Sequence, residues 1–169
     1  MGSGISGSYS GTKGGSQPYA DTYSVVKEEL NKDKKDPDIY NPDSGYFKNP
    51  TAIILQNSIE NNSVHIDGKR QDGELTYVMD KSGNIIIGKR FNPNDNRKRS
   101  PHPTLIGGKN PKVQCAGIIK CKKGRIFSVN NQSGHFRPNP KSLDKVKEAL
   151  QKMADKHPEW FSKDSEWRK

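Results

Sequence analysis

Acidic side chains are almost absent from the middle of the chain. Between Lys81 and Leu143 the only carboxylate is Asp95, against fourteen lysines and arginines. This segment carries a charge of +13 in a 169-residue protein whose net charge is +10, so the remainder sums to −3. Such an asymmetry indicates a polyanionic partner, nucleic acid or a nucleotide. A solvated basic face, or one matched to an acidic protein, is the alternative.

Long apolar runs and cysteines are also scarce. Only 29% of residues are apolar, and no stretch approaches the roughly 18 residues of a membrane span or forms a signal-peptide core. We therefore expect no membrane span and no export signal within the domain itself. The two cysteines, Cys115 and Cys121, would lie about 20 Å apart on one extended strand. That separation excludes a disulfide between them and predicts a reduced domain active in the cytosol.

The beginning of the chain differs in composition from the rest. Met1 to Gly15 contains six glycines and four serines, which is typical of a flexible linker. We expect residues 1–18 to form a flexible leader or junction and residues 19–169 to form a single domain.

The N-terminal half predicts short helices. A helix is predicted from Asp21 or Thr22 to Leu30, where apolar side chains share one face. Asn49-Pro50 indicates the start of a second short helix, although the unbroken apolar run at 53–55 would also suit a strand.

Two hairpins are predicted farther along the chain. Glu74–Asp80 and Asn84–Phe91 would form the first, and Val113–Cys121 and Arg125–Asn131 the second. The second is predicted to have the three-residue loop 122–124, because glycine in third place suits a left-handed residue.

The three-residue loop fixes the expected register of the second hairpin. It pairs Ile119 with Phe127 and gathers apolar residues on one face, which favours it over a two-residue loop. By the same alternation Ser133 and His135 would project from that face beyond the strand end.

A closing helix completes the prediction. Ser142 is expected to cap it, with Leu143, Val146, Leu150 and Met153 in one apolar stripe. Residues 92–103 are expected to form a polar, basic loop. The fold class is therefore α+β, with one or two N-terminal helices, a mostly antiparallel sheet of four or five strands, and a C-terminal helix.

Two histidines, His102 and His135, lie inside the basic segment. Metal-independent RNA cleavage needs a proton acceptor, a proton donor and a cation, and histidine serves as either acid or base near neutral pH. We predict His135, His102, Ser133 and Arg90 as catalytic residues. The residues expected to bind substrate are Lys89, Arg97, Arg99, Thr104, Lys122, Arg125 and Arg137. A hydrogen-bonded structural histidine is the alternative at both positions.

Other chemistries find less support. A cysteine thiolate paired with His135 is conceivable, but both cysteines alternate onto the apolar face, which favours buried packing. Zinc-ligand spacings, the zinc deaminase motif and the P-loop are absent, so no metal is expected. No glutamate lies between Glu74 and Glu148. An ADP-ribosyltransferase using NAD therefore remains an alternative that would need Glu148 or a later glutamate.

Residues 102–138 carry a resemblance. His102-x-Thr-Leu, Gly107-Gly, Ala116-Gly-x-Ile, Gly124-x-Ile and Ser133-Gly-His-Phe-x-Pro resemble a pattern in C-terminal domains of bacterial polymorphic toxins. The segment is also similar to part of the plant IQ-motif calmodulin-binding proteins. The element from Ser133 to Pro138 is its most specific part, while Pro103 and Thr104 depart from the pattern.

The layout of a flexible junction followed by a basic domain is similar to toxin tips of contact-dependent growth inhibition and Rhs systems. The resemblance implies a domain secreted as part of a larger protein and delivered to the target-cell cytosol. It also implies neutralisation by a cognate immunity protein, expected to be acidic.

The leading hypothesis is an antibacterial, metal-independent ribonuclease without a cofactor, acting on tRNA or on another RNA or ribosome-associated target. An NAD-consuming toxin and a non-catalytic nucleic-acid or protein binding module are the alternatives.

Overall fold

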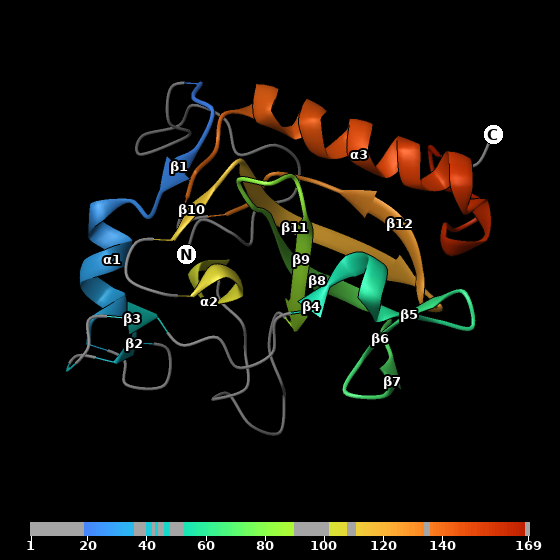
Figure 1. Ribbon diagram of the computed structural model, residues 1–169, viewed down its shortest axis with the longest axis horizontal. Helices are drawn as coiled ribbons and strands as arrows, with labels where there is room; N and C mark the ends of the chain where they lie inside the picture. Colours follow the sequence, from blue (N-terminus) through green and yellow to red (C-terminus); the bar gives the residue numbers. More distant parts are fainter. Residues whose placement is uncertain are drawn as a thin grey trace.

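A five-stranded antiparallel sheet forms the centre of the protein (Figure 1). The computed structural model describes residues 19–35, 40–41, 43, 46–47, 53–89, 102–107, 111–133 and 136–167. The strand order is β12-β11-β8-β9-β4. The five strands are β4 (Ile53–Ile54), β8 (Gly73–Met79), β9 (Ile85–Lys89), β11 (Cys115–Lys122) and β12 (Arg125–Val129). The expected α+β class with four or five mainly antiparallel strands is confirmed.

The first predicted hairpin is confirmed as β8 and β9. Tyr77 pairs with Ile87 in the antiparallel register. The turn depends on Asp80, whose Oδ1 accepts hydrogen bonds from the backbone N–H groups of Ser82 and Asn84 at 2.9 and 2.8 Å. An aspartate that satisfies backbone donors two and four residues ahead stabilises a tight turn by this means.

The second hairpin is also present, but its predicted register is wrong. Lys122 pairs with Arg125, so the loop has two residues, Lys123 and Gly124, with φ angles of 51° and 82°. Two successive left-handed residues suit the twist of a two-residue hairpin. A β-bulge beyond Lys120 then shifts the pairing, and Ile119 lies opposite Val129 instead of Phe127.

The closing helix α3 (Leu143–Lys156) covers one face of the sheet (Figure 1). All four residues of the expected apolar stripe are buried. They pack in one core with Tyr77, Cys115 and Ile119 of the sheet. Ser142 precedes the helix but makes no side-chain cap, because its Oγ is hydrogen-bonded to Tyr23 Oη at 2.7 Å.

The other face of the sheet carries a second, smaller core. Val78 and Ala116 point to this side, away from Tyr77 and Cys115, which belong to the core under α3, and pack with Leu105 and Phe136. Leu105 belongs to α2 (His102–Ile106), a short helix where the sequence predicted the end of a loop. The helix places His102 against the sheet.

The N-terminal segment differs from its prediction. Tyr23 and Ser24 form β1, which pairs with β10 (Lys112–Val113), and the helix α1 begins only at Lys27 and ends at Asp33. Tyr23 is buried in the second core, where a strand partner about 90 residues away overrides the local helical pattern. A short pair, β2 (Tyr40–Asn41) and β3 (Tyr46–Phe47), follows.

The segment after β4 forms a 3-10 turn and a three-stranded sheet. The predicted second helix is therefore wrong and the strand alternative is correct for Ile53–Ile54. Two tight turns join the three strands, at Asn61-Asn62 and at Asp67-Gly68, all with positive φ. The elements are η2 (Leu55–Ser58), β5 (Ile59–Glu60), β6 (Ser63–Ile66) and β7 (Lys69–Arg70).

Two further 3-10 turns flank α3, η4 (Pro140–Ser142) and η5 (Pro158–Trp160). The predicted leader at residues 1–18 lies outside the described residues. Among the described helices, none combines the length and apolar character needed to cross a membrane.

Replacement of Leu150 by alanine tests the packing of α3 on the sheet. Leu150 is completely buried, so we expect Leu150→Ala to lower the free energy of unfolding by about 2 to 5 kcal/mol. The neighbouring Gln151 is exposed, and Gln151→Ala should cost less than about 0.5 kcal/mol. Urea denaturation measures both; equal losses would contradict this packing.

Candidate functional site

His102 is buried beneath the sheet. Its side chain lies at the start of α2, with only 2% of its surface exposed. Its Nε2 donates a hydrogen bond to the backbone carbonyl of Gly117 at 2.7 Å, because a carbonyl oxygen can only accept. This geometry favours the structural alternative for His102 over direct contact with a substrate.

Gly117 lies on β11 at the point where the backbone of Asn130 and Asn131 passes close to the strand. A β-carbon at this position would lie 2.0 Å from the carbonyl oxygen of Asn130. That oxygen accepts a 2.6 Å hydrogen bond from Tyr77 Oη. The side-chain Oδ1 of Asn130 accepts hydrogen bonds from the backbone N–H groups of Ile118 and Gln132 at 3.0 and 2.9 Å. We call Tyr77, His102, Gly117 and Asn130 the buried junction.

Ser133 lies immediately beyond the buried junction and is itself fully buried. Its Oγ accepts a hydrogen bond from the backbone N–H of Phe136 at 3.2 Å, and its carbonyl accepts one from Arg137 at 2.8 Å. Ser133 therefore stabilises a local turn. The predicted catalytic partner His135 lies outside the described residues.

Gln132 is a buried residue that the sequence did not single out. Its side chain is completely inaccessible, and neither amide atom has a hydrogen-bond partner among the described residues. A buried amide without partners is uncommon because desolvation of each polar atom costs free energy. No residue pattern in the sequence indicates it.

The cysteines pack in the core, as expected. Burial raises the pKa of Cys115 to about 11 and that of Cys121 to about 12. Tyr77 Oη lies 3.6 Å from Cys115 Sγ, and burial, followed by the proximity of Cys115, raises the pKa of the Tyr77 phenol well above its ordinary value. Both thiols are protonated near neutral pH, so neither is an activated nucleophile.

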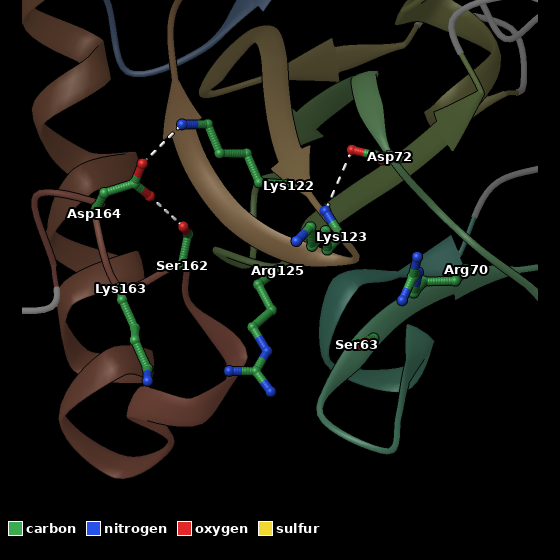
Figure 2. A pocket seen from close by; sticks show the side chains of 9 residues that line it. All are labelled: Ser63, Arg70, Asp72, Lys122, Lys123, Arg125, Ser162, Lys163 and Asp164. Atoms are coloured by element: carbon green, nitrogen blue, oxygen red, sulfur yellow. Dashed lines mark hydrogen bonds and ion pairs between the residues drawn. The ribbon is translucent and has the colours of Figure 1, made fainter.

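A basic cleft lies at the opposite end of β11. Lys122 is the fifth residue after Gly117, a span of about 17 Å on an extended strand. The cleft has a volume of about 760 Å³, and Figure 2 shows the side chains around it. It is lined by Ser63, Arg70, Asp72, Lys122, Lys123, Arg125, Ser162, Lys163 and Asp164.

Backbone contacts at the hairpin tip hold the walls of the basic cleft together. The carbonyl of Gly124 accepts the backbone N–H of Val64 at 2.7 Å. A β-carbon on Gly124 would lie 2.6 Å from Ser63 Cβ and 2.7 Å from Arg70 Cγ. The tip of the β11–β12 hairpin is therefore fitted tightly against β6 and β7.

The third wall of the basic cleft comes from the C-terminal segment. Phe161 forms a parallel bridge with Ile126 of β12, and the N–H of Ser162 donates to the carbonyl of Ile126 at 2.8 Å. These contacts bring Lys163 and Asp164 beside the hairpin (Figure 2).

Positive charge dominates the basic cleft. Its lining includes five cationic residues and two carboxylates. No described carboxylate forms an ion pair with the side chain of Arg70, Arg125 or Lys163. Asp72 instead accepts the backbone N–H of Lys123 at 3.2 Å. The cleft therefore has a positive balance suited to an anion.

Lys122 is a cation of the basic cleft that already has an anionic partner. Its Nζ lies 2.8 Å from Asp164 Oδ2 and 3.8 Å from the centre of the Phe127 ring. Asp164 also accepts a short hydrogen bond from Ser162 Oγ. The hydrogen bonds from Lys122 and Ser162 lower the pKa of the Asp164 carboxyl.

The predicted substrate-binding residues are divided between these places. Lys122 and Arg125 come together in the basic cleft. Lys89 does not line it, and its Nζ lies 3.7 Å from Asp67 Oδ2. Arg137 is half-buried beyond the opposite end of β12. Outside the described residues lie Arg90, Arg97, Arg99 and the side chain of Thr104.

Sequence reasoning missed the two cationic residues of the basic cleft that lie outside the β11–β12 hairpin, Arg70 and Lys163. Both stand outside the segment with the strongest positive charge. Tight-turn signals at Asp67-Gly68 would have identified the β6–β7 hairpin that carries Arg70. Nothing in the local sequence indicates that Lys163 returns to the β11–β12 hairpin.

Neither a search for metal ligands nor comparisons with known proteins point to another site. Within the described ranges, no group of three or more His, Cys, Asp or Glu side chains could hold a metal ion. Comparisons with protein-family models, curated proteins and solved structures found no match.

Gly117→Ala should disrupt the buried junction. The new methyl group would collide with backbone atoms of Asn130, which cannot move aside as the end of a flexible side chain can. We expect a loss of about 3 kcal/mol in the free energy of unfolding, at the upper end of typical overpacking costs. Ala116→Gly on the same strand controls for altered backbone freedom. A Gly117→Ala protein with wild-type stability would contradict the close approach.

The buried thiols should make stability fall at alkaline pH. The folded-state pKa of Cys121, about 12, lies above its ordinary value of 9.0, so its contribution is complete below pH 9 and is lost as pH rises toward 12. We expect Cys121→Ala to flatten the decline in unfolding free energy between pH 9 and pH 11 by up to about 1.4 kcal/mol per pH unit. Urea denaturation at several pH values measures this, and parallel curves would refute it.

Proposed function

We propose that this protein is an antibacterial toxin domain that binds and cleaves RNA, with the RNA phosphates held in the basic cleft. One observation carries the proposal: cationic side chains from three separate parts of the chain converge on a single open cleft. Arg70 comes from β7, Lys122 and Arg125 from the β11–β12 hairpin, and Lys163 from the C-terminal segment.

The composition of the basic cleft suits a phosphate chain. Arginine offers a planar fork of N–H donors and lysine a mobile point charge, and both are the usual contacts to phosphate oxygens. Arg70, Arg125 and Lys163, which form no ion pair with any described carboxylate, would release counterions from RNA on binding. A run of phosphates gains from several such contacts, whereas a single phosphate would use only some of them.

The proposed chemistry relies on His135. Near neutral pH its imidazole can accept the 2′-hydroxyl proton or donate one to the leaving oxygen. We assign His102 a supporting role, because its ring is buried and holds the carbonyl of Gly117. Delivery into the target cytosol as part of a larger protein, and neutralisation by an acidic immunity protein, belong to the same proposal.

The NAD-consuming alternative has no specific observation in its favour. Glu148 lies on α3, where its exposed carboxylate is 3.6 Å from Lys152 Nζ. It is not among the residues that line the basic cleft. We therefore carry RNA cleavage forward as the proposal.

RNA binding and cleavage by cleft variants test the proposal. Lys122→Gln with Arg125→Gln removes two cleft charges and should weaken binding of a single-stranded RNA about tenfold or more. The slope of log affinity against log salt should fall by up to about 1.4, since each full contact to a single strand contributes about 0.7. Lys147→Gln with Lys152→Gln, on α3 and outside the cleft, removes the same charge and should have little effect. Equal behaviour of the two double variants would overturn RNA binding in the cleft.

The role of His135 is tested in the same assay. We expect His135→Ala to bind RNA with wild-type affinity while losing RNA cleavage and toxicity on expression in bacteria. Wild-type RNA affinity in this variant would show that the protein is folded and that cleavage is lost because the imidazole is missing. Retained cleavage and toxicity would refute the assignment to His135, and absence of RNA cleavage by the wild-type protein would refute the ribonuclease.

A further inference from the structure

We propose that the Asp164 carboxylate occupies the position of a substrate phosphate in the basic cleft, and that RNA binds by displacing it from Lys122. This inference rests on the proposed function, because it names how the same cleft is regulated. Asp164 would act as a built-in competitor that sets the affinity and selectivity of the cleft for polyanions.

The contacts of Asp164 are those of a bound phosphate. One carboxylate oxygen lies 2.8 Å from Lys122 Nζ, and the other accepts a hydrogen bond from Ser162 Oγ (Figure 2). An ammonium group and a hydroxyl are common donors to phosphate oxygens. A negative group therefore already occupies the anion-binding position at Lys122.

The contact between Asp164 and Lys122 can be exchanged. The two side chains are 60% and 43% exposed, so an incoming anion can reach both. Exposed ion pairs contribute little to stability because water and salt screen them. A phosphate that replaces the carboxylate would gain the Lys122 contact, and further phosphates of the same chain would be available to Arg125 and Lys163, which also line the cleft.

Replacement of the Asp164 carboxylate by a phosphate at Lys122 gives the basic cleft a preference for chains of phosphates over single phosphates. A single phosphate that displaces Asp164 gains one cation and leaves a carboxylate without its partner. A chain of phosphates also contacts the remaining cations of the cleft and offsets that loss. The ordinary pKa of an aspartate, 3.8, is already far below neutral pH, and Lys122 and Ser162 lower the pKa of Asp164 further, so the competition does not depend on pH near neutrality.

Competition by Asp164 should also affect how the RNA affinity depends on salt concentration. In the wild-type protein part of the charge of Lys122 is already compensated by Asp164, so its contact with RNA releases fewer counterions. Removal of the carboxylate makes that charge fully available. The slope of log affinity against log salt should then steepen by up to about 0.7 for a single strand.

Asp164→Asn is the direct test, with a 2′-O-methyl RNA hexamer as a probe that cannot be cleaved through its 2′-oxygen. The amide keeps the shape and can still accept from Ser162, but it lacks the charge that holds Lys122. We expect binding about three- to fivefold tighter and a steeper salt slope. Glu148→Gln is the matched control, because Glu148 is also an exposed carboxylate paired with a lysine.

A double-variant cycle shows whether the gain acts through Lys122. In the background of Lys122→Gln, Asp164→Asn should give no more than the gain of Glu148→Gln, which measures net charge alone. If Asp164→Asn matches Glu148→Gln in the wild-type background too, the exchange is refuted. The proposed function stands in that case if Lys122→Gln with Arg125→Gln still weakens RNA binding about tenfold or more.

Carboxyl NMR of Asp164 provides a test that does not require RNA to bind. Displacement from Lys122 removes the main cause of its lowered pKa and places a negative group nearby, so saturation with the hexamer should raise that pKa. If the hexamer does not bind, the RNA proposal fails, and pyrophosphate serves as the probe for exchange itself. An unchanged Asp164 pKa with either bound probe would overturn the inference.

Discussion

The two-residue turn at Lys123 and Gly124 determines where the walls of the basic cleft stand. Its left-handed residues set the pairing of Lys122 with Arg125, which places these two basic residues opposite each other at the end of the sheet. Its glycine allows the hairpin tip to approach Ser63 and Arg70 more closely than any side chain would permit. A larger residue at position 124 would separate β6 and β7 from the hairpin.

The buried junction is the corresponding constraint at the other end of β11. There Gly117 allows the chain to cross over the strand, and Tyr77 and His102 satisfy the carbonyl groups of Asn130 and Gly117. Buried carbonyl groups need partners, because an unsatisfied polar group costs free energy in the low-dielectric interior. A histidine in a basic sequence segment, which suggests a catalytic role, can therefore have a structural role as the hydrogen-bond donor to a buried backbone carbonyl.

The fold could be predicted from the sequence where residues close together in the chain determine the structure. The apolar stripe of α3 and the hairpin of β8 and β9 are local patterns, and both are confirmed. The register of β11 and β12 was not predictable in the same way. A lysine in the left-handed region is unfavourable by itself, and the docking of Gly124 against β6 compensates for it only in the folded protein.

Long-range pairing explains the remaining differences. Tyr23 has a helical sequence context but pairs with Val113, a contact that no window of neighbouring residues contains. Sequence reasoning identified Lys122 and Arg125 as candidates for substrate binding from local charge. It could not identify Lys163, because the contact of the C-terminal segment with Ile126 is tertiary.

Mapping of backbone amide shifts on addition of an uncleavable single-stranded RNA tests the central claim most directly. Binding in the basic cleft predicts that the perturbed amides cluster at Arg70, at residues 122–125 and at residues 162–164. The exposed face of α3, which carries Lys147 and Lys152, should remain unperturbed. Perturbations centred on α3, or none at all at the β11–β12 hairpin, would contradict the account.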